Sequence, residues 1–94
     1  MRWDDSKRIV LDVAQRASKL GLVPYTSGNF SLRDADSGYI AITPSGTRYD
    51  RMTESDIVMV NQAGEVREGN TRVSSEIGLH LAVYRSRPEV HGIV

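Results

Sequence analysis

The sequence predicts an α/β fold in which helices cover a sheet. Two segments carry apolar residues at helical spacing, and short strand-like runs bounded by turn formers lie between and after them. The predicted order is helix, antiparallel strands, helix and a final strand, without a repeat or an internal linker. Ninety-four residues suffice for one small domain, so we expect a single domain over residues 1–94.

The first predicted helix covers residues 4–20. Asp4, Asp5 and Ser6 provide capping oxygens and negative charge at its start, and Gly21 suits its end. This is the pattern of an amphipathic helix with one face on a core. The apolar positions that recur every three or four residues are Ile9, Val10, Val13, Ala14, Ala17 and Leu20.

Short strands and turns fill the middle of the chain. The predicted strands cover residues 30–33, 39–43, 57–60 and 65–67. Residues 53–56 have the capping-box pattern of a single helical turn.

A second helix is predicted from about residue 75 to residue 85, with Pro88 just beyond its end. A strand over residues 90–94 follows it. One face of this helix carries Ile77, His80, Leu81 and Tyr84.

The composition narrows the classes of partner. Twelve Lys and Arg residues balance twelve Asp and Glu residues, and neither sign forms a long block. This argues against nucleic-acid or membrane-surface binding. The chain has no cysteine, which excludes disulfides and thiolate metal sites. No apolar run approaches bilayer length and no secretory signal is present at the start, so we expect a cytoplasmic protein.

Three segments combine small polar residues with glycine or a helix start: residues 26–29, 43–46 and 74–76. Each alone is explained as an ordinary turn or a helix cap. Together they predict a cradle for one phosphate monoester, because glycine admits a ligand to the backbone and a helix N-terminus attracts anions. The donors would be Asn29, Ser45, Ser74, Ser75 and backbone N–H groups.

Glu76 is the one acid in this set and is therefore the candidate general base. His80 lies one helical turn later, and for a lone histidine on such a helix we favour a packed or hydrogen-bonded core residue. We also favour a structural role for His91. The spacing of these three residues matches no closed zinc motif.

Three ordered stretches at matching intervals carry a family resemblance: TSGNFSLRD, ITPSGTRYDRMTESDIVMV and SSEIGLHLAVYRSRPEVHGIV. They resemble the class II aldolase and adducin N-terminal family, and within it the L-fuculose-1-phosphate aldolase type. The resemblance implies a three-layer α/β/α sandwich with a central, mainly antiparallel sheet, incomplete in this chain. It also implies a homotetramer with active sites between subunits.

The resemblance also implies roles for individual residues. Glu76 would be the catalytic acid/base, and it would also bind Zn²⁺ when no substrate is present. Zinc would act as a Lewis acid while a ketose 1-phosphate of the fuculose, rhamnulose or ribulose type is cleaved to dihydroxyacetone phosphate and an aldehyde. The substrate phosphate would be bound by Gly28, Asn29, Ser45, Gly46, Ser74 and Ser75.

The family carries a His-x-His pair directly after the strand that here reaches Val94, and a third histidine much later. These 94 residues contain none of the three, and His91 is not a replacement for the pair. We therefore expect this chain to be the N-terminal portion of a longer domain and to be inactive alone.

Other functions within the same family stay open. A pentulose-phosphate 4-epimerase or a methylthioribulose-phosphate dehydratase would use the same zinc and phosphate cradle. A non-catalytic interaction module like the adducin head is a further alternative. We favour the aldolase because residues 43–46 and 74–76 look slightly more aldolase-like, and a pure scaffold has no chemical need for Glu76.

Overall fold

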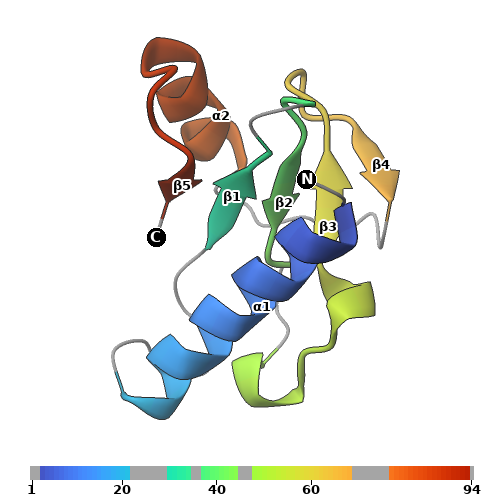
Figure 1. Cartoon of the computed structure of the whole chain (residues 1–94), viewed down its shortest axis with the longest axis vertical. Helices are drawn as coiled ribbons and strands as arrows, with labels where there is room; N and C mark the ends of the chain where they lie inside the picture. Colours follow the sequence, from blue (N-terminus) through green and yellow to red (C-terminus); the bar gives the residue numbers. More distant parts are fainter. Residues whose placement is uncertain (1–2, 22–29, 35–36, 45–47, 69–76, 94) are drawn as a thin grey trace.

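The computed structural model describes residues 3–21, 30–34, 37–44, 48–68 and 77–93. Two α-helices, five short strands and two single-turn 3₁₀ helices lie in these ranges (Figure 1). In chain order they are α1 (Trp3–Lys19), β1 (Ser31–Arg33), β2 (Ile40–Ile42), η1 (Tyr49–Arg51), η2 (Glu54–Asp56), β3 (Val58–Val60), β4 (Val66–Glu68), α2 (Ile77–Ser86) and β5 (Gly92–Ile93).

The strands form one sheet in the order β4-β3-β2-β1-β5, and every neighbouring pair is antiparallel. Leu32 of β1 pairs with Ala41 of β2, which in turn pairs with Met59 of β3. On the other side of β1, Leu32 pairs with Gly92 of β5. β5 thus comes after α2 in the chain but returns to pair with β1. The predicted antiparallel sheet is confirmed.

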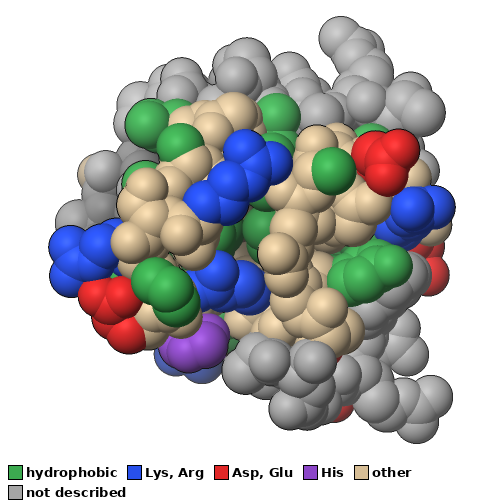
Figure 2. All heavy atoms as spheres, turned by 90° about the horizontal axis from the view of Figure 1, so that it is seen from above, with side chains coloured by type: hydrophobic (Ala, Val, Ile, Leu, Met, Phe, Trp, Pro, Cys, Tyr) green, Lys and Arg blue, Asp and Glu red, His purple; other side chains and the backbone are tan. Residues whose placement is uncertain are grey.

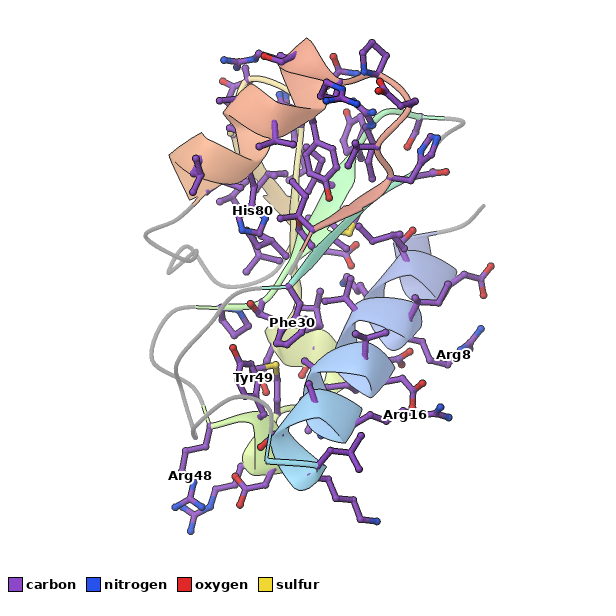
Figure 3. All side chains as sticks on the ribbon, turned by 90° about the vertical axis from the view of Figure 1, so that its left-hand side faces the viewer. Arg8, Arg16, Phe30, Arg48, Tyr49 and His80 are labelled. Carbon is purple, nitrogen blue, oxygen red and sulfur yellow. The ribbon has the colours of Figure 1, made fainter. Side chains whose placement is uncertain are left out.

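The two helices cover opposite faces of the sheet. Val10 and Ala14 of α1 pack in one buried cluster with Ala41 and Met59. The strand residues on either side of these alternate to the other face. There they pack against α2 in a second cluster, formed by Ile40, Ile42, Val58, Val60, Leu81 and Tyr84. Figure 3 shows the sheet between the helices, with Phe30 and Tyr49 on the α1 side and His80 on the α2 side. The predicted three-layer α/β/α arrangement is confirmed.

The apolar face of α1 is narrower than its sequence pattern indicates. Val10 and Ala14 are buried, but Ile9 and Val13 are each 43% exposed and Leu20 is 73% exposed. Val10 and Ala14 are four positions apart and share one stripe of the helix, which faces the sheet. Ile9 and Val13 instead border a hollow of about 130 Å³ that is also lined by Ile93.

The 3₁₀ helix η1 was not predicted, whereas the helical turn at 53–56 was. η2 has the expected capping box between Thr53 and Asp56. The turn η1 depends on contacts from elsewhere in the chain: Gln15 Nε2 of α1 donates to the carbonyl oxygens of Tyr49 at 3.0 Å and Met52 at 2.9 Å. The Tyr49 ring also packs edge-on against Phe30, with ring centroids 5.6 Å apart.

The described surface carries charges of both signs. Figure 2 shows basic, acidic and hydrophobic side chains intermixed on one face. Several exposed charges pair with close neighbours in sequence, such as Arg8 with Asp5 and Arg87 with Glu89. Exposed pairs of this kind contribute little stability, roughly 0–1 kcal/mol each. Neither described helix has the length and hydropathy needed to cross a membrane.

Candidate functional site

The predicted site residues lie outside the described residues, so their assignment stays a prediction. The residues next to each predicted loop are described: Phe30, Pro44 and Ile77. These flanking residues fix the points from which the loops depart. The undescribed site residues are Gly28, Asn29, Ser45, Gly46, Ser74, Ser75 and Glu76.

The flanks of the first two predicted loops are hydrogen-bonded to each other. The Thr43 N–H donates to the Phe30 carbonyl oxygen at 3.1 Å, and the Phe30 N–H donates to Thr43 Oγ1 at 3.3 Å. Both residues are buried. Phe30 directly follows residue 29, and Thr43 comes two positions before Ser45. The two predicted loops therefore meet the described structure at the same end of β1 and β2.

A buried polar chain connects this end of β1 to α2. Ser31 Oγ lies 2.6 Å from His80 Nδ1 and 2.7 Å from the Tyr84 hydroxyl. Ser31, His80 and Tyr84 are 5%, 4% and 3% exposed, so water does not compete for these bonds. The prediction that His80 is a hydrogen-bonded core residue is confirmed.

His80 lies in the first turn of α2, three residues after Ile77, which borders the third predicted loop. Since His80 contacts Ser31, the first turn of α2 lies against the start of β1. The flanks of the first two predicted loops and the first turn of α2 thus meet around Phe30, Ser31 and Thr43.

Arg33, which no sequence pattern singled out, anchors the other end of α2. Its guanidinium donates to the carbonyl oxygens of Tyr84 at 2.8 Å, Pro88 at 2.7 Å and Val90 at 2.5 Å. The central carbon of the guanidinium, Cζ, also lies 4.8 Å from the centroid of the Tyr84 ring. Carbonyl groups at a helix C-terminus lack partners within the helix and carry partial negative charge. One arginine side chain therefore stabilises the end of α2 and the turn into β5.

The environment of Tyr84 shifts its acidity. Burial raises the pKa of the Tyr84 phenol, and the hydrogen bond with Ser31 and the positive charge of Arg33 offset part of that rise. Burial also raises the pKa of Tyr49 on the opposite side of the sheet. Tyr84 is therefore a neutral hydroxyl partner for Ser31 at physiological pH.

A second long-range contact, an ion pair, is made by the strand that precedes Ser74, Ser75 and Glu76 in the chain. Lys7 of α1 forms an ion pair with Glu68, the last residue of β4. The Lys7 side chain is 8% exposed, whereas that of Glu68 is 47% exposed. Sequence reasoning missed this pair because its members are 61 positions apart.

Residues 8–94 match the family model for the class II aldolase and adducin N-terminal domain. The chain belongs to this family. The sequence motifs had predicted this family, and the prediction is confirmed.

Individual relatives agree with the family. The chain is 40% identical over 88 residues to an L-ribulose-5-phosphate 4-epimerase from Salmonella paratyphi B, covering 94% of this chain and 39% of that protein. A solved L-fuculose 1-phosphate aldolase is 34% identical with a TM-score of 0.88, over 94% of this chain and 42% of that one. A second, from Thermus thermophilus, is 31% identical with a TM-score of 0.73, over 93% and 43%. The chain thus spans about two-fifths of the length of these relatives.

The described part of this class II aldolase-family chain does not itself assemble a metal site. No group of three His, Cys, Asp or Glu residues that could hold a metal ion occurs within the described ranges. The His91 imidazole is exposed, and its backbone carbonyl accepts a hydrogen bond from the Arg33 N–H at 2.7 Å. The described contact of His91 is therefore through its backbone. Glu76, the one metal ligand predicted in this chain, lies outside the described residues.

Proposed function

We propose that this chain forms the phosphate-binding and proton-transferring part of a zinc-dependent class II aldolase. The substrate would be a ketose 1-phosphate of the fuculose, rhamnulose or ribulose type, and the products dihydroxyacetone phosphate and an aldehyde. One observation supports the proposal: Phe30 bonds to Thr43 while Ser31 bonds to His80, so the flanks of the first two predicted phosphate loops lie beside the first turn of α2. Family membership supports the same conclusion.

The phosphate would be bound mainly by neutral donors. Residues 26–29, 43–46 and 74–76 contain no lysine or arginine. Asn29, Ser45, Ser74 and Ser75 would donate from their side chains, and Gly28 and Gly46 would let the phosphate approach backbone N–H groups. The N-terminus of α2 would add the favourable field of its dipole. Such a site would suit one phosphate monoester.

Glu76 would transfer the proton. Cleavage of the C3–C4 bond would leave the electron pair on C3 as an enediolate, while the C4 hydroxyl passes its proton to the Glu76 carboxylate and becomes the aldehyde. Glu76 would then deliver that proton to C3. A positioned acid/base of this kind typically contributes about 10²–10⁴-fold in rate. Bound Zn²⁺ would supply Lewis-acid stabilisation of the developing negative charge, with Glu76 as its ligand from this chain before substrate binds.

An epimerase is the second candidate. The relative that is 40% identical over 88 residues is an L-ribulose-5-phosphate 4-epimerase, and this observation favours inversion at C4 of a pentulose 5-phosphate. Such a substrate carries the same kind of phosphate monoester, so the cradle itself suits either reaction. With either activity, we propose a cytoplasmic homotetramer.

The test is a pair of product assays on the native polypeptide that contains this chain, purified with Zn²⁺. We expect dihydroxyacetone phosphate from L-fuculose, L-rhamnulose or L-ribulose 1-phosphate. Glu76→Gln should lower kcat by about 10²–10⁴-fold. Inversion of L-ribulose 5-phosphate at C4 without release of dihydroxyacetone phosphate would select the epimerase instead. Absence of both reactions would leave the methylthioribulose-phosphate dehydratase or a non-catalytic module of the adducin-head kind.

A further inference from the structure

The hydrogen bonds of His80 do more than fill space between α2 and the sheet. Ser31, the partner of His80, also bonds to Tyr84, which belongs to a buried, mainly apolar cluster with Ile42, Val58 and Leu81. Burying polar groups carries a desolvation cost, and apolar side chains of similar volume would hold a helix against a sheet without it. The polar chain must therefore have a role other than holding α2 against the sheet.

What a hydrogen bond adds is position. Apolar contacts tolerate shifts of a helix along its axis, because similar volumes pack in several registers. A hydrogen bond weakens steeply outside a narrow range of distance and angle. Ser31 bonds to two residues of α2 four positions apart, His80 at 2.6 Å and Tyr84 at 2.7 Å. Two bonds from one oxygen fix both the rotation of α2 and its displacement along β1.

Building on the proposed function, we propose that His80 is a positioning residue for the phosphate cradle and for Glu76. Ser74, Ser75 and Glu76 directly precede α2, whereas Gly28 and Asn29 directly precede Phe30 and β1. The bond between His80 and Ser31 joins these two sides of the cradle. It sets the register of α2 against β1, and with it the distance between the proton-transferring carboxylate and the bound phosphate.

Because the bond to Ser31 is made by a single atom of His80, substitutions can be chosen that keep or remove that bond. Ser31 contacts Nδ1, and an asparagine side chain ends in an amide at about the same distance from the backbone. His80→Asn can therefore keep the bond, whereas His80→Leu keeps apolar volume and loses it. Leu79→Ala is the matched control, because Leu79 is the neighbouring residue of α2 and is 62% exposed.

Two measurements on the native polypeptide test the proposal. One is kcat with the substrate that the product assays identify, and the other is the Kd for inorganic phosphate. Temperatures well below the Tm of each variant separate positioning from unfolding. We expect His80→Leu to lower kcat by about 10–100-fold, as a displacement near 1 Å can do, and to weaken phosphate binding about tenfold. We expect His80→Asn to recover most of both losses, and Leu79→Ala to match the wild type.

The outcomes separate this inference from the proposed function. Wild-type turnover decides the function, and the ratio between the two His80 variants decides the positioning role. If the wild type binds phosphate without turnover, the phosphate Kd values alone decide. Equal kcat and Kd values for the Leu and Asn variants, with only the Tm changed, would overturn the positioning role. So would a wild type that binds no phosphate.

Discussion

Lys7 near the start of α1 and Glu68 at the end of β4 form an ion pair across 61 positions of sequence. The two partners differ in environment, since the Lys7 side chain is 8% exposed and that of Glu68 is 47% exposed. The pair ties the first helix to the edge strand that leads towards residues 74–76. Because Lys7 is buried and Glu68 is half exposed, removing one partner should cost a different free energy from removing the other.

The first prediction follows from that asymmetry. Glu68→Gln leaves a buried ammonium without its counter-charge, and we expect it to lower the free energy of unfolding by about 1–3 kcal/mol, less than for a fully buried pair because Glu68 is half exposed. Lys7→Met removes the buried charge and keeps the hydrocarbon stem, so we expect a change within about 1 kcal/mol. Urea unfolding measures both. Asp12→Asn, which breaks the exposed pair with Arg16, is the control. A larger loss for Lys7→Met than for Glu68→Gln would contradict the prediction.

The second prediction concerns the Ser31 hydroxyl. Ser31→Ala deprives His80 Nδ1 and the Tyr84 hydroxyl of a buried partner. We expect a destabilisation of about 1–3 kcal/mol, the usual cost of such a loss. Ser55→Ala, which removes an exposed hydroxyl bonded to Thr53, should change stability by less than about 0.5 kcal/mol. Similar denaturation midpoints for the two variants would show that the buried chain does not stabilise the fold.

The third prediction contrasts two glycines. Gly64 has φ +89° in the turn before β4, and an added Cβ would lie 3.0 Å from Leu81 Cδ1. Gly64→Ala should therefore destabilise by about 1–2 kcal/mol. Gly78 lies exposed in α2 with nothing near an added Cβ, so Gly78→Ala should stabilise by about 0.5–1 kcal/mol. Thermal unfolding of both variants provides the measurement, and the same sign of change in Tm would refute the contrast.

The fourth prediction is a loss of stability at alkaline pH. Burial raises the pKa values of Tyr49 and Tyr84 above their usual value of about 10. Below pH 10 these phenols are protonated in both the folded and the unfolded state. As pH rises from about 10 towards the folded-state pKa values, the unfolded chain releases these protons first. Stability should then fall by at most about 1.4 kcal/mol per pH unit for each group.

Urea midpoints between pH 8 and pH 11 measure this fall. Tyr84→Phe should make the decline above pH 10 shallower, and adding Tyr49→Phe should flatten it further. An unchanged slope in the double variant would assign the alkaline transition to other groups.

Local patterns predicted most of the elements. The periodicity of α1 and the apolar run of β3 depend on residues within one helical turn or one strand, and such short-range order is visible in the sequence. The limits of this reasoning appear at Ile9 and Val13, which fit the helical pattern but remain 43% exposed. Periodicity gives an apolar face to a helix, but tertiary packing decides how much of that face is covered.

The candidate site shows the same division. The glycines, serines and Glu76 of the predicted site could be selected from residue chemistry, and three ordered motifs were enough to predict the family. The residues that connect the flanks of those loops could not be selected in this way. Ser31 and His80 are ordinary as a strand serine and a helix histidine, and nothing in either neighbourhood indicates that they bond.

By itself, the sequence determined the types of the α-helices and strands, the family and the kinds of side chain at the predicted loops. Only the tertiary structure decided that Ser31 meets His80, that Lys7 meets Glu68, and that Arg33 caps the end of α2. These partners are 49 to 61 positions apart. Helical and strand periodicity relate residues only a few positions apart, whereas these contacts arise from strand order and from the faces on which the helices pack.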